Sequence, residues 1–441
     1  DYSIEGIAED YTPEIIVKPG SKNEIQKIVK IACRHDVPVY TWGGGTGMAG
    51  SCLAVQGGIV LDMKRMNRIL EVDVENLCVA VEAGATMDAV YREVDRKGMF
   101  FPHHPEPAVS STIGGTLSTM GLNVFTAKYG YAFDFVLGLE LVLGNGELLK
   151  VGGKSYLSLP SHNLLNLFLG AEGTLGIITE AILKIYPNPE FRTRYSLGFR
   201  SLQDALDACV AMQKAGIAIE TVYMFDRPFL LRYLKRIQMG APRNMTWAML
   251  LGFSGDAKVA MFNAKEALKT CRKSRATKLP TALTESWWQS IWITKETYDK
   301  SSFSISAKAF EGDIIDACIP FGKFQEYYDY YLELKKKYGW GKLHYGSGMV
   351  ASPRGPIPFG LYVGAPIDTK SKAEIQKWFD FKEKIYRRAL SLGGSLSAAN
   401  GMGLRSSMWA REQLGSGLDY LKEIKKILDP RNILCRGHRG F

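Results

Sequence analysis

Apolar residues recur at helical spacing shortly before a glycine-rich stretch. Four of them, at offsets 0, 3, 4 and 7, are Ile25, Ile28, Val29 and Ala32. This spacing predicts one apolar face of a helix. Ser21 and Glu24 have the Ser-x-x-Glu spacing of a capping box, so the helix should begin there and end near 35–36. Pro38 then opens a strand, Pro38-Val39-Tyr40. Helix, strand and loop in this order predict a small α/β lobe.

Short apolar runs bounded by turn residues predict several strands in the first half of the chain. These runs are 59–62, 69–74, 78–82, 136–144 and 147–151. Asn145-Gly146 between the last two predicts a hairpin. Thr86 is expected to cap a helix over 87–97, which Gly98 ends.

The pattern changes after about residue 190. Amphipathic helices are predicted over 201–215, 257–273, 322–337 and 371–391. Short strands are predicted over 247–252, 314–319 and 360–364. Such a run without glycine loops indicates an antiparallel sheet covered by helices, an α+β cap. One more helix is expected around 417–427.

Bulk properties narrow the class of protein. A chain of 441 residues is too long for one core and predicts at least two domains. Seven scattered cysteines without a C-x-x-C motif indicate reduced thiols in a cytoplasmic protein and no iron–sulfur cluster on this chain. No apolar run reaches about 18 residues, so the chain is not expected to span a membrane. The net charge of +10 is spread along the chain, which argues against nucleic-acid binding but suits an anionic substrate or an acidic partner.

The glycine-rich stretch is Thr41-Trp42-Gly43-Gly44-Gly45-Thr46-Gly47-Met48-Ala49-Gly50. Its glycines allow a sharp turn and leave a row of N–H groups that suits a phosphate or pyrophosphate. No Lys follows, so it is not the phosphate loop of nucleotide triphosphatases. No clear helix opens after it, so the dinucleotide fingerprint fits poorly. The loop alone leaves a flexible connection open as the alternative.

Further motifs follow the loop in a fixed order. They are Gly57-Gly58-Ile59-Val60-Leu61-Asp62, Met66-Asn67-Arg68-Ile69, Val81-Glu82-Ala83-Gly84-Ala85-Thr86, Thr112-Ile113-Gly114-Gly115, Lys128-Tyr129-Gly130 and 170–180. The series resembles the FAD-binding half of the vanillyl-alcohol-oxidase (PCMH-type) flavoprotein family. It looks most like the branch with the glycolate oxidase catalytic subunit and FAD-linked D-lactate dehydrogenases. The resemblance implies an α+β fold with a two-lobed PCMH-type FAD-binding domain (1–189), a cap (190–395) and a C-terminal return to the FAD domain (396–441).

The resemblance also implies which residues bind FAD. They are Trp42, Gly43, Gly44, Gly45, Thr46, Gly47, Met48, Pro102, His103, Thr112, Gly114, Gly115, Ser118, Lys128, Tyr129, Glu172, Gly173, Gly176, Ile177, Ile178 and Asn432. Three prolines make 101–107 stiff and extended. Because His103 and His104 are adjacent, they should point to opposite sides, and at most one can face the cofactor. No His lies in the glycine loop, so noncovalent FAD is expected.

The substrate site departs from the pattern of its relatives. Relatives bind a divalent metal with two histidines and a Glu, and use the His after that Glu as base. Here His344 keeps one ligand position, while Ala351 and Ala399 replace the others and Asn400 replaces the base. One imidazole cannot hold Mn²⁺ or Zn²⁺ tightly, so no catalytic metal is expected.

Two functions therefore stay open. In the first, an FAD-dependent dehydrogenase oxidises a D-lactate- or glycolate-like 2-hydroxy acid, or a related alcohol, without metal. His344, with Tyr345, would accept the proton, Asn400 would orient a substrate oxygen, and Lys295 would bind the carboxylate. His344 as a polar residue at the domain seam is the alternative. Three nearby tryptophans, Trp287, Trp288 and Trp292, form either core or an aromatic wall of the substrate pocket.

In the second, the chain is a degenerate flavin-bearing subunit that passes electrons without oxidising a substrate. In both cases electrons leave to an outside acceptor, because the chain has no nicotinamide fingerprint after a strand. Relatives use iron–sulfur subunits, electron-transferring flavoproteins or quinone-linked partners. We therefore expect a subunit of a complex, peripheral to the membrane through a partner if at all, with slow turnover on oxygen.

Overall fold

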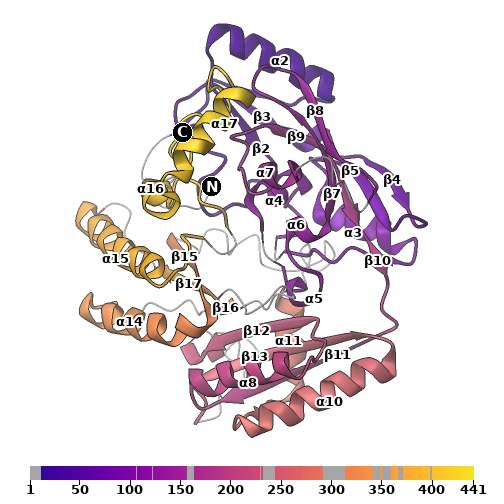
Figure 1. The fold of residues 1–441 in the computed structure, drawn as a ribbon, viewed down its shortest axis with the longest axis vertical. Helices are drawn as coiled ribbons and strands as arrows, with labels where there is room; N and C mark the ends of the chain where they lie inside the picture. Colours follow the sequence, from indigo (N-terminus) through magenta and orange to yellow (C-terminus); the bar gives the residue numbers. More distant parts are fainter. Residues whose placement is uncertain are drawn as a thin grey trace.

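The computed structural model describes residues 11–105, 107–121, 123–155, 163–228, 230–231, 244–291, 313–340, 348–349, 359–365, 371–397 and 400–441. Figure 1 shows the first half of the chain and the C-terminal helices together at one end of the molecule, and the sheet-and-helix cap at the other.

The N-terminal lobe begins with a small parallel sheet in the order β1-β3-β2. Its strands are β1 (Ile15–Val17), β2 (Val39–Trp42) and β3 (Ile59–Asp62). Helix α2 (Lys22–His35) connects β1 to β2. Ser21 caps it by accepting from the Glu24 N–H, and Asp36 ends it in a left-handed conformation. The helix therefore begins and ends where the sequence predicted.

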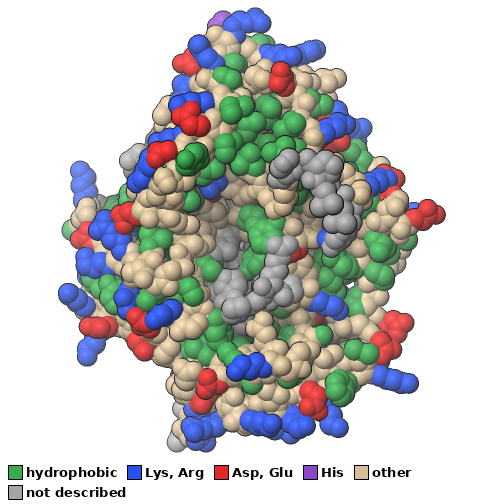
Figure 2. Space-filling model, in the orientation of Figure 1, with side chains coloured by type: hydrophobic (Ala, Val, Ile, Leu, Met, Phe, Trp, Pro, Cys, Tyr) green, Lys and Arg blue, Asp and Glu red, His purple; other side chains and the backbone are tan. Residues whose placement is uncertain are grey.

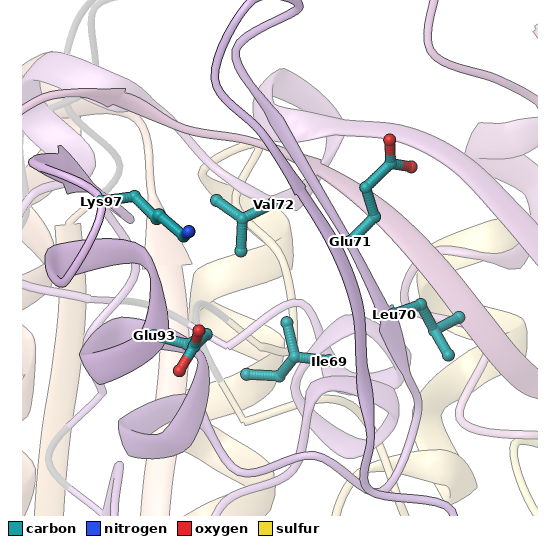
Figure 3. A pocket seen from close by; sticks show the side chains of 6 residues that line it. All are labelled: Ile69, Leu70, Glu71, Val72, Glu93 and Lys97. Atoms are coloured by element: carbon teal, nitrogen blue, oxygen red, sulfur yellow. The ribbon is translucent and has the colours of Figure 1, made fainter.

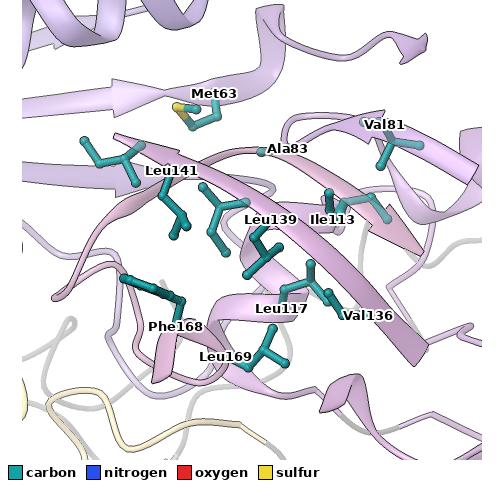
Figure 4. Close-up of a cluster of buried hydrophobic side chains, with 14 of the residues drawn as sticks. Met63, Val81, Ala83, Ile113, Leu117, Val136, Leu139, Leu141, Phe168 and Leu169 are labelled. Atoms are coloured by element: carbon teal, nitrogen blue, oxygen red, sulfur yellow. The ribbon is translucent and has the colours of Figure 1, made fainter. Parts of the chain in front are cut away.

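A five-stranded antiparallel sheet in the order β4-β5-β9-β7-β8 forms the rest of this half. Its strands are β4 (Ile69–Asp73), β5 (Cys78–Glu82), β7 (Val136–Val142), β8 (Leu148–Gly152) and β9 (Ile177–Lys184). One face packs against short helices through buried Val81, Leu139, Leu141, Ile113 and Leu117, which Figure 4 shows interdigitating. This core fixes the loops that emerge from the sheet.

Short elements connect these sheets. They are η1 (Met63–Arg65), α3 (Met87–Asp95), α4 (Ile113–Thr119), α5 (Thr126–Tyr129), α6 (Ala132–Phe135), α7 (Leu165–Phe168), and the pair β6 (Met99–Phe100) and β10 (Tyr186–Pro187). Thr86 caps α3 by accepting from the Ala89 N–H, as predicted, and Gly98 follows with φ +69°.

In the part of the cap that the structure describes there are two antiparallel sheets, which confirms the predicted fold class. The first has the order β12-β13-β11-β14, with β11 (Phe191–Phe199), β12 (Thr221–Asp226), β13 (Trp247–Gly255) and β14 (Thr277–Lys278). Helices α8 (Leu202–Lys214) and α10 (Ala257–Lys273) cover its outer face, away from the N-terminal half (Figure 1). Helix α11 (Thr281–Ile291) and α5 lie on the inner side.

The second sheet has the order β15-β17-β16, with β15 (Asp313–Ile319), β16 (Gly348–Met349) and β17 (Phe359–Ala365). Turn η4 (Phe321–Lys323) and helices α14 (Phe324–Lys337) and α15 (Lys372–Ser391) pack with it. Tyr327, Trp378, Phe381 and Ile385 are fully buried in the shared core.

The C-terminal segment packs on the N-terminal half. It contains η5 (Ser407–Trp409), α16 (Ala410–Leu414) and α17 (Gly417–Leu428). Leu434 forms a parallel bridge with Val39 of β2. The buried Lys425 ammonium donates to Asp429 Oδ2 at 2.7 Å and to the carbonyls of Thr174 and Leu434 at 2.8 and 3.0 Å. These bonds fasten α17 to the loop before β9.

Candidate functional site

The glycine loop after β2 runs between the first turn of α4 and the C-terminal segment. A Cβ on Gly43 would collide with Thr112 Oγ1, and one on Gly44 would collide with the Ser110 carbonyl. Gly45 has φ +64° and lies against the Trp42 ring. Apart from its chain neighbours, no described residue lies within 4 Å of a Cβ placed on Gly47. Contacts with other protein atoms thus require glycine at 43–45, whereas the space beside Gly47 is available to a ligand.

Thr112 and the two glycines after it form the opposite side of this loop. Thr112 caps α4 by accepting from the Gly115 N–H at 3.3 Å. A Cβ on Gly114 would lie 2.9 Å from Ala83 Cβ, so this glycine lets α4 pack closely against the chain leaving β5. The structure therefore brings Gly43, Gly44, Thr112 and Gly115 together, and their binding of FAD stays a prediction.

Glu172 connects three segments around the loop. Its N–H donates to the Ser118 carbonyl. Its buried carboxylate accepts from Ser51 Oγ and from the Met402 and Gly403 N–H groups, each at 2.7 Å. The Leu404 and Arg405 N–H groups donate to the Ala49 carbonyl. The Glu172 carboxylate thus bonds to other protein groups, and these bonds join the C-terminal segment to the glycine loop.

The neighbouring residues of this segment are buried beneath the site. Gly173, at φ +77°, lies beside Thr41 Oγ1 and Cys435 Sγ. Gly176 packs near Leu141, and Ile177 and Ile178 begin β9. Asn432, at φ +48°, lies in the C-terminal chain that pairs with β2, and its carbonyl accepts from Arg436 Nε at 2.7 Å.

The two adjacent histidines lie in an extended, buried segment. His103 Nδ1 is 2.8 Å from Asn123 Nδ2, which makes Nδ1 the acceptor and leaves the proton on Nε2. Burial lowers the pKa of His103 to about 3, and His104 adds to this shift, so the ring is neutral. His103 packs against Phe135, whereas His104 packs against Tyr91. The two rings thus have different surroundings, as predicted.

Lys128 and Tyr129 contact the cap and neighbouring aromatic rings. Lys128 Nζ donates to the carbonyl and hydroxyl oxygens of Ser254 in the cap, at 3.2 and 3.0 Å. The Tyr129 ring lies 4.8 Å from Tyr186 and 5.7 Å from Phe100. Both residues contribute to the seam between the two halves of the molecule.

Three of the four residues predicted for catalysis, Lys295, His344 and Tyr345, lie outside the described residues. Asn400 is described, and both its N–H and its side-chain Nδ2 donate to Asp316 Oδ2 at 2.9 Å. Arg405 lies 3.5 Å from the same carboxylate oxygen, with both side chains fully buried. Sequence reasoning missed Asp316 and Arg405, because nothing in the sequence places β15 beside the C-terminal segment.

Within the described ranges, no three His, Cys, Asp or Glu side chains are arranged to hold a metal ion. His344 and Ala351 fall outside these ranges, so a metal-free site stays a prediction. In the same ranges no helix is long and apolar enough to cross a membrane.

One surface hollow is unrelated to these residues. It lies between β4 and the end of α3 and is lined by Ile69, Leu70, Glu71, Val72, Glu93 and Lys97 (Figure 3). A second view shows hydrophobic side chains around a central hollow, with Lys and Arg scattered at the periphery (Figure 2). On this face, Lys and Arg side chains are interspersed with Asp and Glu.

Comparison with known proteins agrees with this geometry. Residues 13–152 match the family described as FAD binding domain, and residues 188–438 match the family described as FAD linked oxidases, C-terminal domain. Glycolate oxidase subunit GlcD of Bacillus subtilis is 30% identical over 96% of this chain and 88% of its own length. D-lactate dehydrogenase of Archaeoglobus fulgidus is 28% identical over 96% of this chain and 90% of its own length.

A solved structure shares the fold. That of p-cresol methylhydroxylase with substrate bound has a TM-score of 0.74 at 18% identity, covering 98% of this chain and 90% of its own. The glycine cradle at 43–47, with its open side at Gly47, fits a cofactor held by backbone amides. The family matches and the cradle together give the cofactor, FAD, and the class of enzyme. The chain is an FAD-linked oxidoreductase and belongs to the FAD-linked oxidase family.

Proposed function

We propose that this FAD-linked oxidoreductase oxidises a small 2-hydroxy acid of the D-lactate or glycolate type, or a related alcohol. The observation that carries this proposal is the extent of the similarity. Relatives named glycolate oxidase subunit and D-lactate dehydrogenase match over 96% of the chain, including the cap as well as the FAD-binding half. An electron-transfer subunit that had lost its substrate would have no need to keep the cap.

The chain's own residues would position the substrate and move its proton. FAD, when bound, accepts the hydride from the substrate carbon. We propose His344, assisted by Tyr345, as the acceptor of the hydroxyl proton, and Lys295 as one contact to the carboxylate. Asn400 is held by two bonds to Asp316, which supports a fixed amide that orients a substrate oxygen. No divalent metal is part of this proposal, because Ala351 and Ala399 supply no ligand.

We further propose that electrons pass to a separate protein, an iron–sulfur subunit or a flavoprotein, or to a quinone. The net charge of +10 supports an acidic partner, whose binding would weaken as salt rises. Co-purification from the native source and rates with oxygen and artificial acceptors test this step. A lone protein that reacts with oxygen as fast as with any dye would be an oxidase instead.

The test of the proposed reaction is an anaerobic screen of hydroxy acids and alcohols for bleaching of the bound flavin. We expect glycolate or D-lactate to bleach it, with metal content well below one equivalent after dialysis. Flavin that stays oxidised with every compound, but is reduced by a donor protein, would favour the degenerate electron-transfer subunit. Stoichiometric metal and activity lost to chelators would contradict the metal-free site.

A further inference from the structure

The inner face of the cap sheet carries two arginines that the proposed function has not used. Side chains alternate along a strand, so Arg192, Arg194 and Ser196 of β11 share one face. Ser196 identifies it as the inner face, because its hydroxyl accepts from Thr284 of α11 at 2.8 Å. Leu197 and Phe199 point the other way, into the core under α8 and α10.

Aromatic rings hold both guanidinium groups in place. The Arg194 guanidinium carbon lies 3.6 Å from the centre of the Trp288 ring. That of Arg192 lies 4.4 Å from the Phe100 ring and 5.7 Å from the Phe125 ring. Stacking of this kind fixes the plane of a guanidinium and leaves its edge available for hydrogen bonds.

Among the described residues at this point of the seam, positive charges outnumber negative ones. Lys128 reaches it from α5 and bonds to Ser254, the cross-strand partner of Arg192. Among the described residues that contact these cations, Glu220 supplies the carboxylate, 3.3 Å from Arg192 Nε. Burial lowers the pKa of Arg194 to about 10, while Glu220 raises it and Arg192 lowers it by smaller amounts, so Arg194 stays charged at neutral pH.

Buried polar atoms here have no partner in the described structure. They are Arg192 Nη2, Arg194 Nε and Thr221 Oγ1, and the Thr221 side chain is fully buried. Thr221 and Arg194 are both cross-strand partners of Gly252 on the strand between them. A Cβ on Gly252 would lie 2.9 Å from Thr221 Cβ, so the glycine lets Thr221 lean toward β11. Buried donors left without a partner are costly, and a guanidinium edge matches a carboxylate in two parallel bonds.

We propose that Arg194, Arg192 and Thr221 form a subsite that binds the carboxylate of the substrate. The ligand is a small carboxylate anion, held by the guanidinium edges and the threonine hydroxyl beside the Trp288 ring. This inference rests on the proposed oxidation of a 2-hydroxy acid, and it gives that acid an anchor built from described residues.

The test measures binding of oxalate, an unreactive dicarboxylate, through the change it causes in the flavin absorbance of the holoenzyme. Arg194→Gln should weaken oxalate binding about 10- to 100-fold, because a charge-assisted pair is lost. Arg194→Lys should recover only part of it, since an ammonium lacks the planar fork. Thr221→Val should weaken it a few-fold. Arg200→Gln, an exposed arginine just after β11, is the matched control and should change nothing.

Flavin content and thermal midpoint of each variant separate binding from folding. The proposal is overturned if wild-type protein does not bind oxalate, or if Arg194→Gln binds it as tightly as wild type. If hydroxy acids reduce the flavin of Arg194→Gln with the same KM as wild type, the subsite is contradicted while the proposed reaction stands. If oxalate binding depends on Arg194 but no hydroxy acid reduces the flavin, the subsite is supported and the proposed oxidation of a 2-hydroxy acid is contradicted.

Discussion

The FAD-binding half and the cap build their sites in different ways. At the glycine loop the geometry is set by backbone, with Gly43 and Gly44 pressed against Thr112 and Ser110 so closely that no side chain fits. On the inner face of the cap the geometry is set by side chains, with Arg194 stacked on Trp288 and Arg192 on Phe100. A backbone site tolerates little change in sequence, whereas a side-chain site changes its ligand through single substitutions.

The same contrast bears on the expected substrate chemistry. The resemblance implies that Ala351, Ala399 and Asn400 stand where relatives have metal ligands and a base. We therefore expect a retained cofactor with changed substrate chemistry, because the glycine loop is constrained by its backbone shape and the cap site by its side chains.

The largest effect is expected at the most crowded glycine of the backbone site. Gly44→Val places its Cβ against the Ser110 carbonyl, which cannot move without shifting the start of α4. We expect a loss of about 3 kcal/mol in the unfolding free energy of the apoprotein, and no retained FAD. Urea unfolding and flavin content measure the two effects. A yellow Gly44→Val protein of wild-type stability would show that the loop is not built by backbone contact.

The free energy of unfolding should fall by about 2 kcal/mol between pH 6.5 and pH 5, because the buried His103 resists protonation. Because the folded-state pKa of His103 is lowered from 6.5 to about 3, its stabilising effect is complete above pH 6.5 and declines as pH falls toward 3. Urea unfolding at several pH values across this range measures how steeply the unfolding free energy depends on pH. His103→Asn should reduce this dependence. His35→Asn, at an exposed position, is the control. An unchanged slope in His103→Asn would contradict the buried neutral ring.

Glu172→Gln tests the joint between the glycine loop and the C-terminal segment. The amide keeps one acceptor but turns a donor toward the N–H groups of Met402 and Gly403. We expect a loss of about 1–2 kcal/mol in unfolding free energy and faster proteolysis after residue 400. Glu147→Gln in the exposed β7–β8 hairpin is the matched control. If the two variants have the same unfolding free energy and rate of proteolysis, Glu172 does not stabilise the contact between the glycine loop and the C-terminal segment.

The smallest effect on folding is expected at Gly47, where the comparison with Gly44 is sharpest. Its backbone has space around it and no positive φ, so Gly47→Val should change apoprotein stability by less than about 1 kcal/mol. FAD affinity should nevertheless fall, because the new side chain would occupy the open side of the cradle. Titration of FAD into the apoprotein measures this. If Gly47→Val binds FAD with wild-type affinity, residue 47 is not part of the cofactor site.

The sequence predicted those parts of the molecule whose causes are local. Ser21 and Thr86 cap the helices they were expected to cap, and Gly98 follows the helix it was expected to end. Strand β11 was missed, because Arg192-Thr193-Arg194 looks like an exposed stretch when its aromatic partners are unknown. The Asp316–Arg405 contact and the seam around Trp288 join segments far apart in the chain, so only the folded structure brings them together.

Anaerobic reduction of the bound FAD by D-lactate and by glycolate, each with hydrogen or deuterium at C2, tests whether this protein oxidises a 2-hydroxy acid. We expect at least one of the two acids to reduce the flavin fully in metal-depleted protein. Deuterium should slow the reduction, because the C2–H bond breaks as the hydride leaves. Flavin that remains oxidised with both acids, while a reduced partner protein or dithionite bleaches it, would contradict hydroxy-acid oxidation by this chain.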